Sequence, residues 1–158
     1  MTELEYLERA EAARGKLYRT ALLTLGGESA AVDAVDEAVY KGYLGFSKLR
    51  QPEFFDTWLT RILLNVCHDE LRRRKRELAV DELPETAAEA FDALPLKEAV
   101  RRLPGELREV VVLRYFTGLT LEETARALDI PRGTVSTRQR RALALLKLDL
   151  TTDEEVAL

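Results

Sequence analysis

The chain has 158 residues, a net charge of −4 and 46% apolar residues, and its abundance of Ala, Leu, Glu and Arg predicts an all-α protein made of two small helical domains. No apolar run approaches the roughly 20 residues of a membrane span, and the acidic N-terminal stretch lacks the basic and apolar segments of a secretory signal, so we expect a cytoplasmic protein without membrane insertion. A single cysteine, Cys67, excludes an intrachain disulfide, and a single histidine, His68, excludes a multi-ligand metal cluster, so we expect neither a metal nor another cofactor.

Two helices are predicted in the first third of the chain. The first runs from Glu3 to about Leu25, where a pair of glycines stops it, and the second has Ser29 as its N-cap and runs to about Phe46. Apolar residues recur at helical spacing in both and are expected on the buried faces: Leu4, Leu7, Leu17, Ala21 and Leu25 in the first helix, and Val32, Val35, Val39 and Tyr43 in the second. Three acidic residues lie on other faces of the second helix: Asp33, Asp36 and Glu37.

A third, longer helix is predicted after the break at Pro52, from Phe54 or Phe55 to Glu77. Its buried side is expected to comprise Leu59, Ile62, Leu63, Val66, Cys67 and Leu71. Polar residues at spacings of three and four form the other side: Arg61, Asn65, His68, Asp69, Arg72, Arg73 and Arg76. The run RRRKR at 72–76 exceeds what the helix macrodipole needs, and like charges repel, so we expect an anionic partner; a generic basic tract is the alternative.

An acidic linker with Pro84 and many small residues follows, and we expect it to be extended or partly helical. The predicted organisation is a helical domain at residues 1–76, a linker at 77–94 and a second helical domain at 95–158. The average charge of −4 therefore conceals two basic modules on either side of an acidic connector.

A helix-turn-helix is predicted near the end of the chain. Thr120 and Glu123 form a capping box that opens a short helix at Leu121, and Gly118 ends the preceding helix. The apolar stripe of the short helix comprises Leu121, Ala125 and Leu128. The turn Asp129-Ile130-Pro131 then breaks the helix, because proline cannot continue the hydrogen-bonding pattern.

The second helix of this motif begins at Arg132 or Gly133. One of its faces carries Val135, Ala142 and Leu146, and no acidic residue precedes Asp149. A slim helix whose charges are all basic suits the major groove of DNA, although a solvated basic face is the alternative. Candidates for contacts to base edges are Arg132, Ser136, Thr137 and Arg140, and candidates for phosphate contacts are Arg138, Arg141 and Lys147. Thr134 is a further candidate DNA-binding residue of this helix.

Two separate segments resemble the sigma-70 family, in its extracytoplasmic-function (ECF) group. Region 4 is matched by L-P at 103–104, R-E-V-V at 108–111, L-R-Y-F at 113–116, G-L-T at 118–120, G-T-V at 133–135, Arg138 and R-A at 141–142. Regions 2.3 to 2.4 are matched by F-F-D-T-W-L-T-R-I at 54–62, then Asn65, Asp69 and the basic run at 72–76. The resemblance implies a promoter-specificity subunit of RNA polymerase that reads the −10 element with its first domain and the −35 element with its second.

The resemblance also implies specific contacts. The −10 set is Trp58, Arg61, Asn65, Asp69, Arg72, Arg73 and Arg76, with the loop at 49–56 holding a flipped base. The amide of Asn65 offers a donor and an acceptor to a base edge, or it is a solvated helix residue, whereas Trp58 is expected to serve packing more than base stacking. Within the region 4 segment the chain departs from the family at two positions: Ser136 stands where a Lys is usual, and Gln139 where an apolar residue is usual.

Partners follow from the same resemblance. The acidic residues Asp33, Asp36 and Glu37 resemble region 2.2, which docks on the clamp helices of core RNA polymerase, or they are surface acids without a specific role. The linker would thread toward the RNA path of the polymerase, and an anti-sigma factor would hide the DNA-binding faces. The alternative function is an ordinary helix-turn-helix regulator that acts without stable binding to core polymerase. An enzyme is not expected, because Cys67 and His68 point to different sides of a helix.

Overall fold

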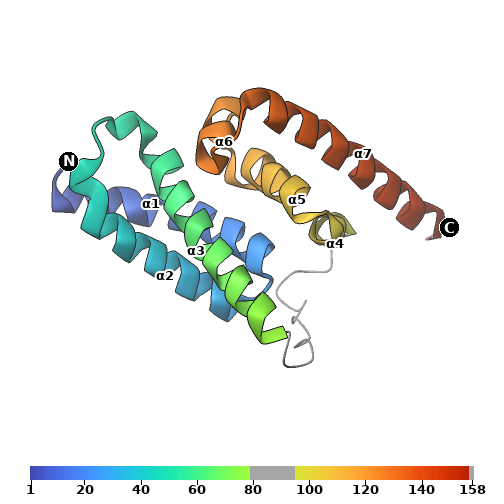
Figure 1. Ribbon diagram of the computed structural model, residues 1–158, viewed down its shortest axis with the longest axis horizontal. Coiled ribbons are helices and arrows are strands. Elements are labelled where there is room, and N and C mark those ends of the chain that lie inside the picture. Colours follow the sequence, from blue (N-terminus) through green and yellow to red (C-terminus); the bar gives the residue numbers. More distant parts are fainter. Residues whose placement is uncertain (79–94, 157–158) are drawn as a thin grey trace. The chain divides into compact units, whose positions relative to one another are not determined.

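The computed structural model describes residues 1–78 and 95–156, which belong to two compact units, Met1–Ala87 and Ala88–Leu158 (Figure 1). All regular structure in these ranges is helical, which confirms the all-α prediction. The predicted acidic linker falls mostly outside the described residues, except that its first two residues, Glu77 and Leu78, belong to a helix. Within the described ranges, no helix combines the length and apolarity that a membrane crossing requires.

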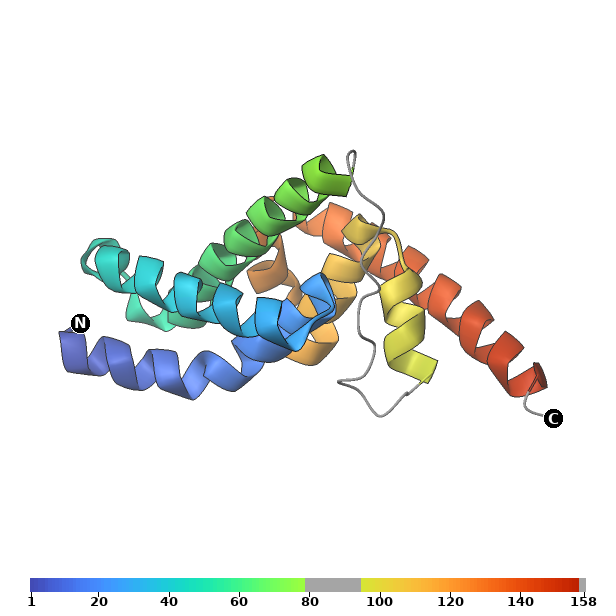
Figure 2. The same ribbon diagram turned by 90° about the horizontal axis from the view of Figure 1, so that it is seen from below.

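The N-terminal unit consists of three long helices: α1 at Glu3–Leu25, α2 at Glu28–Gly45 and α3 at Phe55–Leu78. Two short 3-10 turns, Phe46–Lys48 and Pro52–Phe54, join α2 to α3. Helices α1 and α2 run side by side in opposite directions (Figure 2). All three helix ranges agree with the sequence prediction to within one or two residues, because glycine and proline mark their ends.

The start of α2 differs from the prediction. The N-cap is Gly27, in an extended conformation, whereas Ser29 lies within the first turn and makes no cap. The reason is the sharp end of α1, where Gly26 adopts a left-handed conformation with φ of 82° and donates its N–H to the Leu22 carbonyl oxygen. Only two residues then separate the helices, so α2 begins earlier than a serine cap would allow.

The buried faces of α1 and α2 were predicted only in part. Leu4 and Leu7 are 66% and 52% exposed, so their assignment to the core was wrong, and Tyr6, Ala10 and Ala13 are buried instead. The Tyr6 ring stacks on Phe46 at 5.1 Å between centroids and meets Phe55 edge-on at 5.8 Å, so its larger aromatic surface decides which stripe of α1 faces inward.

Small residues form the packed face of α2. Val35 is buried as predicted, but Val32 and Tyr43 are exposed, and the buried set is completed by Ala31, Ala34, Ala38 and Gly42. A Cβ atom at Gly42 would overlap the Tyr6 hydroxyl and lie 3.0 Å from Leu59, so only glycine allows the ring and the helix to approach so closely. Leucine-sized side chains would hold the two helices further apart.

Helix α3 supplies the rest of this core. Leu59, Leu63, Val66 and Cys67 are buried as predicted, and Leu64 joins them. Two further residues expected on the buried side, Ile62 and Leu71, are only half-buried. The core side of α3 is therefore rotated slightly toward Leu64 relative to the predicted stripe.

The C-terminal unit contains α4 at Pro95–Arg102, α5 at Gly105–Val111, a π-helical turn at Val112–Thr117, α6 at Leu121–Leu128 and α7 at Arg132–Val156. Helices α6 and α7 form the predicted helix-turn-helix. Its centre is a cluster of Val110, Ala125 and Val135, against which Leu121, Leu128 and Ile130 pack. The sequence indicated no π-helical turn.

Candidate nucleic-acid-binding surfaces

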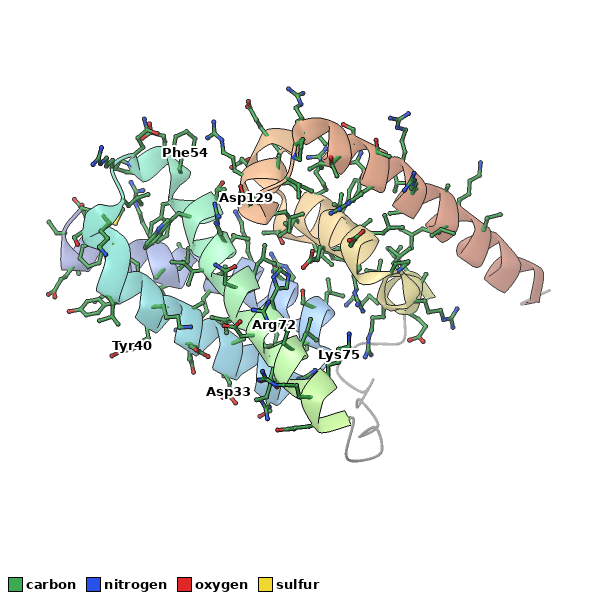
Figure 3. The ribbon with its side chains drawn as sticks, viewed as in Figure 1. Asp33, Tyr40, Phe54, Arg72, Lys75 and Asp129 are labelled. Atoms are coloured by element: carbon green, nitrogen blue, oxygen red, sulfur yellow. The ribbon has the colours of Figure 1, made fainter. Side chains whose placement is uncertain are left out.

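One candidate surface is the polar side of α3. Six of the predicted −10 residues are exposed along it: Arg61, Asn65, Asp69, Arg72, Arg73 and Arg76. Figure 3 shows Arg72 and Lys75 on this helix. The seventh, Trp58, is half-buried, and its ring lies 5.9 Å from that of Phe55. Trp58 thus belongs largely to the packing between α3 and its neighbours, as expected from its spacing.

Carboxylates of α3 neutralise part of its basic run. Arg73 donates to both oxygens of Glu70, at 3.0 and 2.7 Å, and to Glu77 at 2.7 Å, and Arg72 pairs with Asp69. The hydrogen bond from Arg73 holds the pKa of Glu70 below its ordinary value, and the bond from Arg72 does the same for the pKa of Asp69. Part of the positive charge of the basic run at 72–76 is therefore already balanced by carboxylates of the same helix.

Arg74 plays a structural part that the sequence analysis missed. Its Nη1 donates to the carbonyl oxygen of Leu25 at 2.7 Å, and its Nε donates to Glu70 at 3.1 Å. The bond to Leu25 satisfies one of the unpaired carbonyls at the end of α1 and ties that end to α3. The i, i+4 spacing of Glu70 and Arg74 could have predicted their ion pair from the sequence. The contact with Leu25 spans 49 residues, and no local sequence pattern indicates it.

The segment that precedes α3 is held from the other side by α1. Arg9 donates from Nη1 to the Pro52 carbonyl oxygen at 2.8 Å, and its guanidinium lies 5.8 Å from the centre of the Phe55 ring. A groove of about 370 Å³ opens between these elements, lined in part by Lys16 and Asp56. The sequence analysis also missed Arg9, because 43 residues separate it from Pro52.

The second candidate surface begins with α6. Thr120 Oγ1 accepts from the Glu123 N–H at 3.1 Å and Glu123 accepts from the Thr120 N–H at 2.9 Å, so the predicted capping box is confirmed. Gly118 has a left-handed φ of 83°, which suits its predicted role as a helix stop. The end of α6 agrees with the prediction, since the helix ends at Leu128, where the turn Asp129-Ile130-Pro131 begins, and Asp129 adopts a left-handed conformation with φ of 56°.

The predicted −35 residues divide into two groups on α7. Arg132, Thr137, Arg140, Arg141 and Lys147 are exposed, whereas Thr134, Ser136 and Arg138 are half-buried. Arg138 approaches Glu106 of α5 at 3.6 Å between Nη2 and Oε2, and the Thr137 hydroxyl donates to the Gly133 carbonyl oxygen at 3.0 Å. Arg138 therefore has an acidic neighbour within its own unit, unlike Arg132, Arg140 and Arg141, for which the described residues provide no ion pair.

Gln139 lies on the inner side of α7. Its Oε1 accepts a hydrogen bond of 2.9 Å from Arg114 Nε, and Arg114 Nη1 donates to the Leu119 carbonyl oxygen at 2.7 Å. The side chain at this position is half-buried. The unusual polar residue on the apolar stripe of α7 is thus paired with an arginine from the π-helical turn.

A third candidate surface is the acidic side of α2. Asp33, Asp36 and Glu37 are all exposed; Asp36 pairs with Arg14 at 2.8 Å and Glu37 with Lys41 at 3.1 Å. Asp33 and Glu37 border an open groove of about 580 Å³ between α2 and α3.

The same side of α2 carries exposed apolar residues. Tyr40 and Leu44 are 62% and 63% exposed, and Figure 3 shows Tyr40 and Asp33 on the same helix. The sequence analysis did not single them out, although both lie off the buried stripe of α2. This side therefore offers acidic and apolar contacts together.

Comparison with known proteins accounts for both units. Residues 10–77 match the family model of sigma-70 region 2, and residues 99–148 match that of sigma-70 region 4. The chain is 30% identical to the RNA polymerase sigma factor SigV of Bacillus subtilis over 142 residues, which covers 87% of this chain and 86% of SigV. It is 34% identical to the ECF RNA polymerase sigma factor SigM of Mycobacterium tuberculosis over 136 residues, covering 83% and 69% of the two chains.

Solved structures show the same fold. The sigma factor RpoE from Bartonella quintana, solved with the anti-sigma factor NepR, matches with a TM-score of 0.81 at 21% identity and covers 94% of this chain and 98% of that one. CnrH, solved with the cytosolic domain of CnrY, matches with a TM-score of 0.75 at 23% identity, covering 96% and 91%.

Proposed function

The chain belongs to the ECF group of the sigma-70 family, and we propose that it binds core RNA polymerase and directs transcription initiation by recognising −10 and −35 promoter elements. The observation that carries this proposal is the pairing of two family matches, to regions 2 and 4, with two exposed basic helix faces, one in each matched unit. A sigma factor is a recognition subunit, so the bond chemistry of RNA synthesis belongs to the polymerase.

The exposed side of α3 is proposed to hold the −10 element. Unstacking a base costs a few kcal/mol, so an opened strand has to be captured by contacts that replace pairing and stacking. Asn65 supplies an amide for a base edge, and Arg72 and Arg76 supply charge for the flanking phosphates. The segment at 49–56, which Arg9 holds in place, is proposed to receive the flipped base.

The exposed side of α7 is proposed to read the −35 element from the major groove. Arg132 and Arg140 are assigned to base edges and Arg141 to phosphate, since arginine offers a planar pair of donors to guanine and a permanent charge to the backbone. Thr137 and Ser136 complete the base contacts. Arg138 is assigned to a phosphate contact, which would replace its present ion pair with Glu106.

Protein partners are proposed for the remaining surfaces. The acids of α2 suit a basic partner helix, and Tyr40 and Leu44 add apolar area beside them, so this side is proposed to dock on core polymerase in the cytoplasm. An anti-sigma factor is proposed to cover the DNA-binding faces when the factor is inactive, because the Bartonella relative of the same fold was solved with such a partner.

Run-off transcription with purified core polymerase tests the proposal. The wild-type chain is expected to produce discrete transcripts from native templates, and an Asn65→Ala, Arg72→Ala variant is expected to lose them while an Arg19→Ala variant of the opposite helix, α1, retains them. Binding to core polymerase is measured in parallel. A chain that binds duplex DNA but neither binds core polymerase nor initiates would instead be a helix-turn-helix regulator.

A further inference from the structure

One polar residue interrupts the apolar stripe of the recognition helix α7. Val135, Gln139, Ala142 and Leu146 follow one another at spacings of four, three and four, which places them on one side of a helix. Val135, Ala142 and Leu146 are buried in the unit, and Gln139 is half-buried among them. A polar side chain at such a position costs free energy unless its amide finds a partner.

Arg114 is that partner, and it also bonds to a second segment. Its Nε donates to Gln139 Oε1 at 2.9 Å while its Nη1 donates to the Leu119 carbonyl oxygen at 2.7 Å. Leu119 lies in the segment that leads into α6, and Arg114 itself lies in the π-helical turn before it. One guanidinium therefore joins the turn, the entry to α6 and the inner side of α7.

These bonds constrain α7 in a way that apolar contacts do not. Apolar side chains keep most of their contact area when a helix rotates by some degrees, whereas a hydrogen bond weakens steeply as its distance and angle depart from the optimum. The planar guanidinium fixes the two bond directions relative to each other. Rotation of α7 about its axis would move Gln139 away from Arg114. The same rotation would change the direction in which the neighbouring Arg140 points.

We propose that Arg114 and Gln139 are positioning residues that set the rotation of α7 about its own axis, and thereby the selectivity with which α7 reads the −35 element. The proposal assigns neither residue a contact with DNA, since Gln139 faces Arg114 inside the unit. Their effect on recognition passes through the exposed residues on the other side of α7, such as Arg132 and Arg140. The inference rests on the proposed function of this helix.

The decisive variant replaces both partners at once. Arg114→Leu with Gln139→Leu removes the polar pair and leaves an apolar stripe, so neither side chain of the pair is left without its partner, and the Leu119 carbonyl oxygen alone loses its bond to Arg114. The full-length wild type and variant are combined with core polymerase and a promoter library randomised over the upstream element, with the −10 element held constant. The control is Arg102→Leu, the same change at an exposed arginine of α4 that pairs with Glu98 of its own helix at 3.7 Å.

The wild type is expected to discriminate by roughly 5- to 150-fold per mismatched base pair. The double variant is expected to lose at least threefold of that discrimination while keeping the wild-type melting temperature and its transcription from a template with a premelted −10 region. Arg102→Leu is expected to keep the wild-type selectivity. Equal selectivity of the double variant and the wild type would overturn the inference, whereas a wild type that never initiates would overturn the proposed function.

A second variant covers the case in which the double variant melts early. Arg114→Lys keeps the charge and the aliphatic stem, but one ammonium cannot reproduce the two fixed bond directions to Gln139 and Leu119. Its selectivity is expected to fall by at least twofold at an unchanged melting temperature. Selectivity equal to the wild type in Arg114→Lys would count against a positioning role even if the double variant were unfolded.

Discussion

Arg9 of α1 donates a hydrogen bond of 2.8 Å to the carbonyl oxygen of Pro52, which lies in the segment between α2 and α3. The same guanidinium stands 5.8 Å from the Phe55 ring centre. A residue near the start of the chain thus fixes the segment that we propose to receive the flipped −10 base. The position of that segment is a property of the whole N-terminal unit rather than of the loop alone.

We therefore expect Arg9→Leu to impair promoter opening. The loss of one charged hydrogen bond to Pro52 should lower the equilibrium for open-complex formation about tenfold. Permanganate reactivity of unpaired thymines on a supercoiled promoter measures this. Arg19→Leu, the same change at another exposed arginine of α1, should have no effect. Equal impairment in the two variants would indicate a general charge effect.

Arg74 and Arg76 should separate folding from DNA binding. Arg74 bonds to the Leu25 carbonyl oxygen and to Glu70, so Arg74→Ala should lower the free energy of unfolding of the N-terminal unit by about 1 to 3 kcal/mol. Arg76 is exposed, so Arg76→Ala should leave stability unchanged and reduce the salt dependence of promoter binding by about one unit of slope. Urea unfolding and binding titrations at several salt concentrations test the pair, and identical behaviour of the two variants would contradict it.

The same substitution at two glycines should have opposite effects. A Cβ at Gly42 would overlap the Tyr6 hydroxyl, so Gly42→Ala should destabilise the fold by about 1 to 3 kcal/mol despite the better helix propensity of alanine. At Gly15, in α1, the nearest atom is the end of the Arg19 side chain at 3.8 Å, so Gly15→Ala should stabilise by about 0.5 to 1 kcal/mol. Thermal unfolding followed by circular dichroism measures whether each variant is more or less stable than the wild type. A Gly42→Ala variant as stable as the wild type would show that Tyr6 can move.

Alanine substitution of two threonines of the C-terminal unit should affect stability to different extents. Thr120 caps α6, and Thr120→Ala should cost about 1 kcal/mol of stability. Among the described residues the Thr137 hydroxyl bonds to the Gly133 carbonyl oxygen of its own helix alone, so Thr137→Ala should change stability by less than about 0.5 kcal/mol. If Thr137 contacts a base edge, its variant should instead alter the −35 preference, measured by transcription from mismatched promoters.

Alkaline pH should weaken the N-terminal unit through Tyr6. The hydroxyl donates to the Val39 carbonyl oxygen at 2.5 Å, and burial raises the pKa of Tyr6 to about 12 from its ordinary value of 10.0. A raised pKa means that the folded state disfavours the phenolate, so this contribution is intact below pH 10 and is lost as pH rises toward 12. The loss is at most about 2 to 3 kcal/mol. Urea unfolding at pH 9 to 12 should show a shallower decline for Tyr6→Phe, and parallel curves would exclude Tyr6 as the source.

The helices and most of their ends could be predicted because their signals are local, although Ser29 does not cap α2 as predicted. Gly26, Gly118 and the box of Thr120 and Glu123 act within a few residues, and the structure confirms each of them. The resemblance of two segments to one family, on motifs such as those at 54–62 and 113–120, was sufficient for the family itself.

Contacts between distant residues could not be predicted from local patterns. Leu4 and Leu7 fit a helical stripe as well as Tyr6 and Ala10 do, and only the packing of the Tyr6 ring selects between them. Arg9 and Arg74 read as surface cations, because their carbonyl partners lie 43 and 49 residues away. Gln139 was recognised as unusual, but its bond to Arg114 required the fold.

Helix α7 runs without interruption from Arg132 to Val156, a length of about 37 Å at 1.5 Å per residue. Its first turns carry the proposed base contacts, and its last turns lie far beyond them on the same rod. Because the helix is continuous, a protein that bound and displaced its last turns would be expected to change the orientation of its first turns as well. We therefore expect a partner bound to the last turns of α7 to alter promoter choice through the continuous helix.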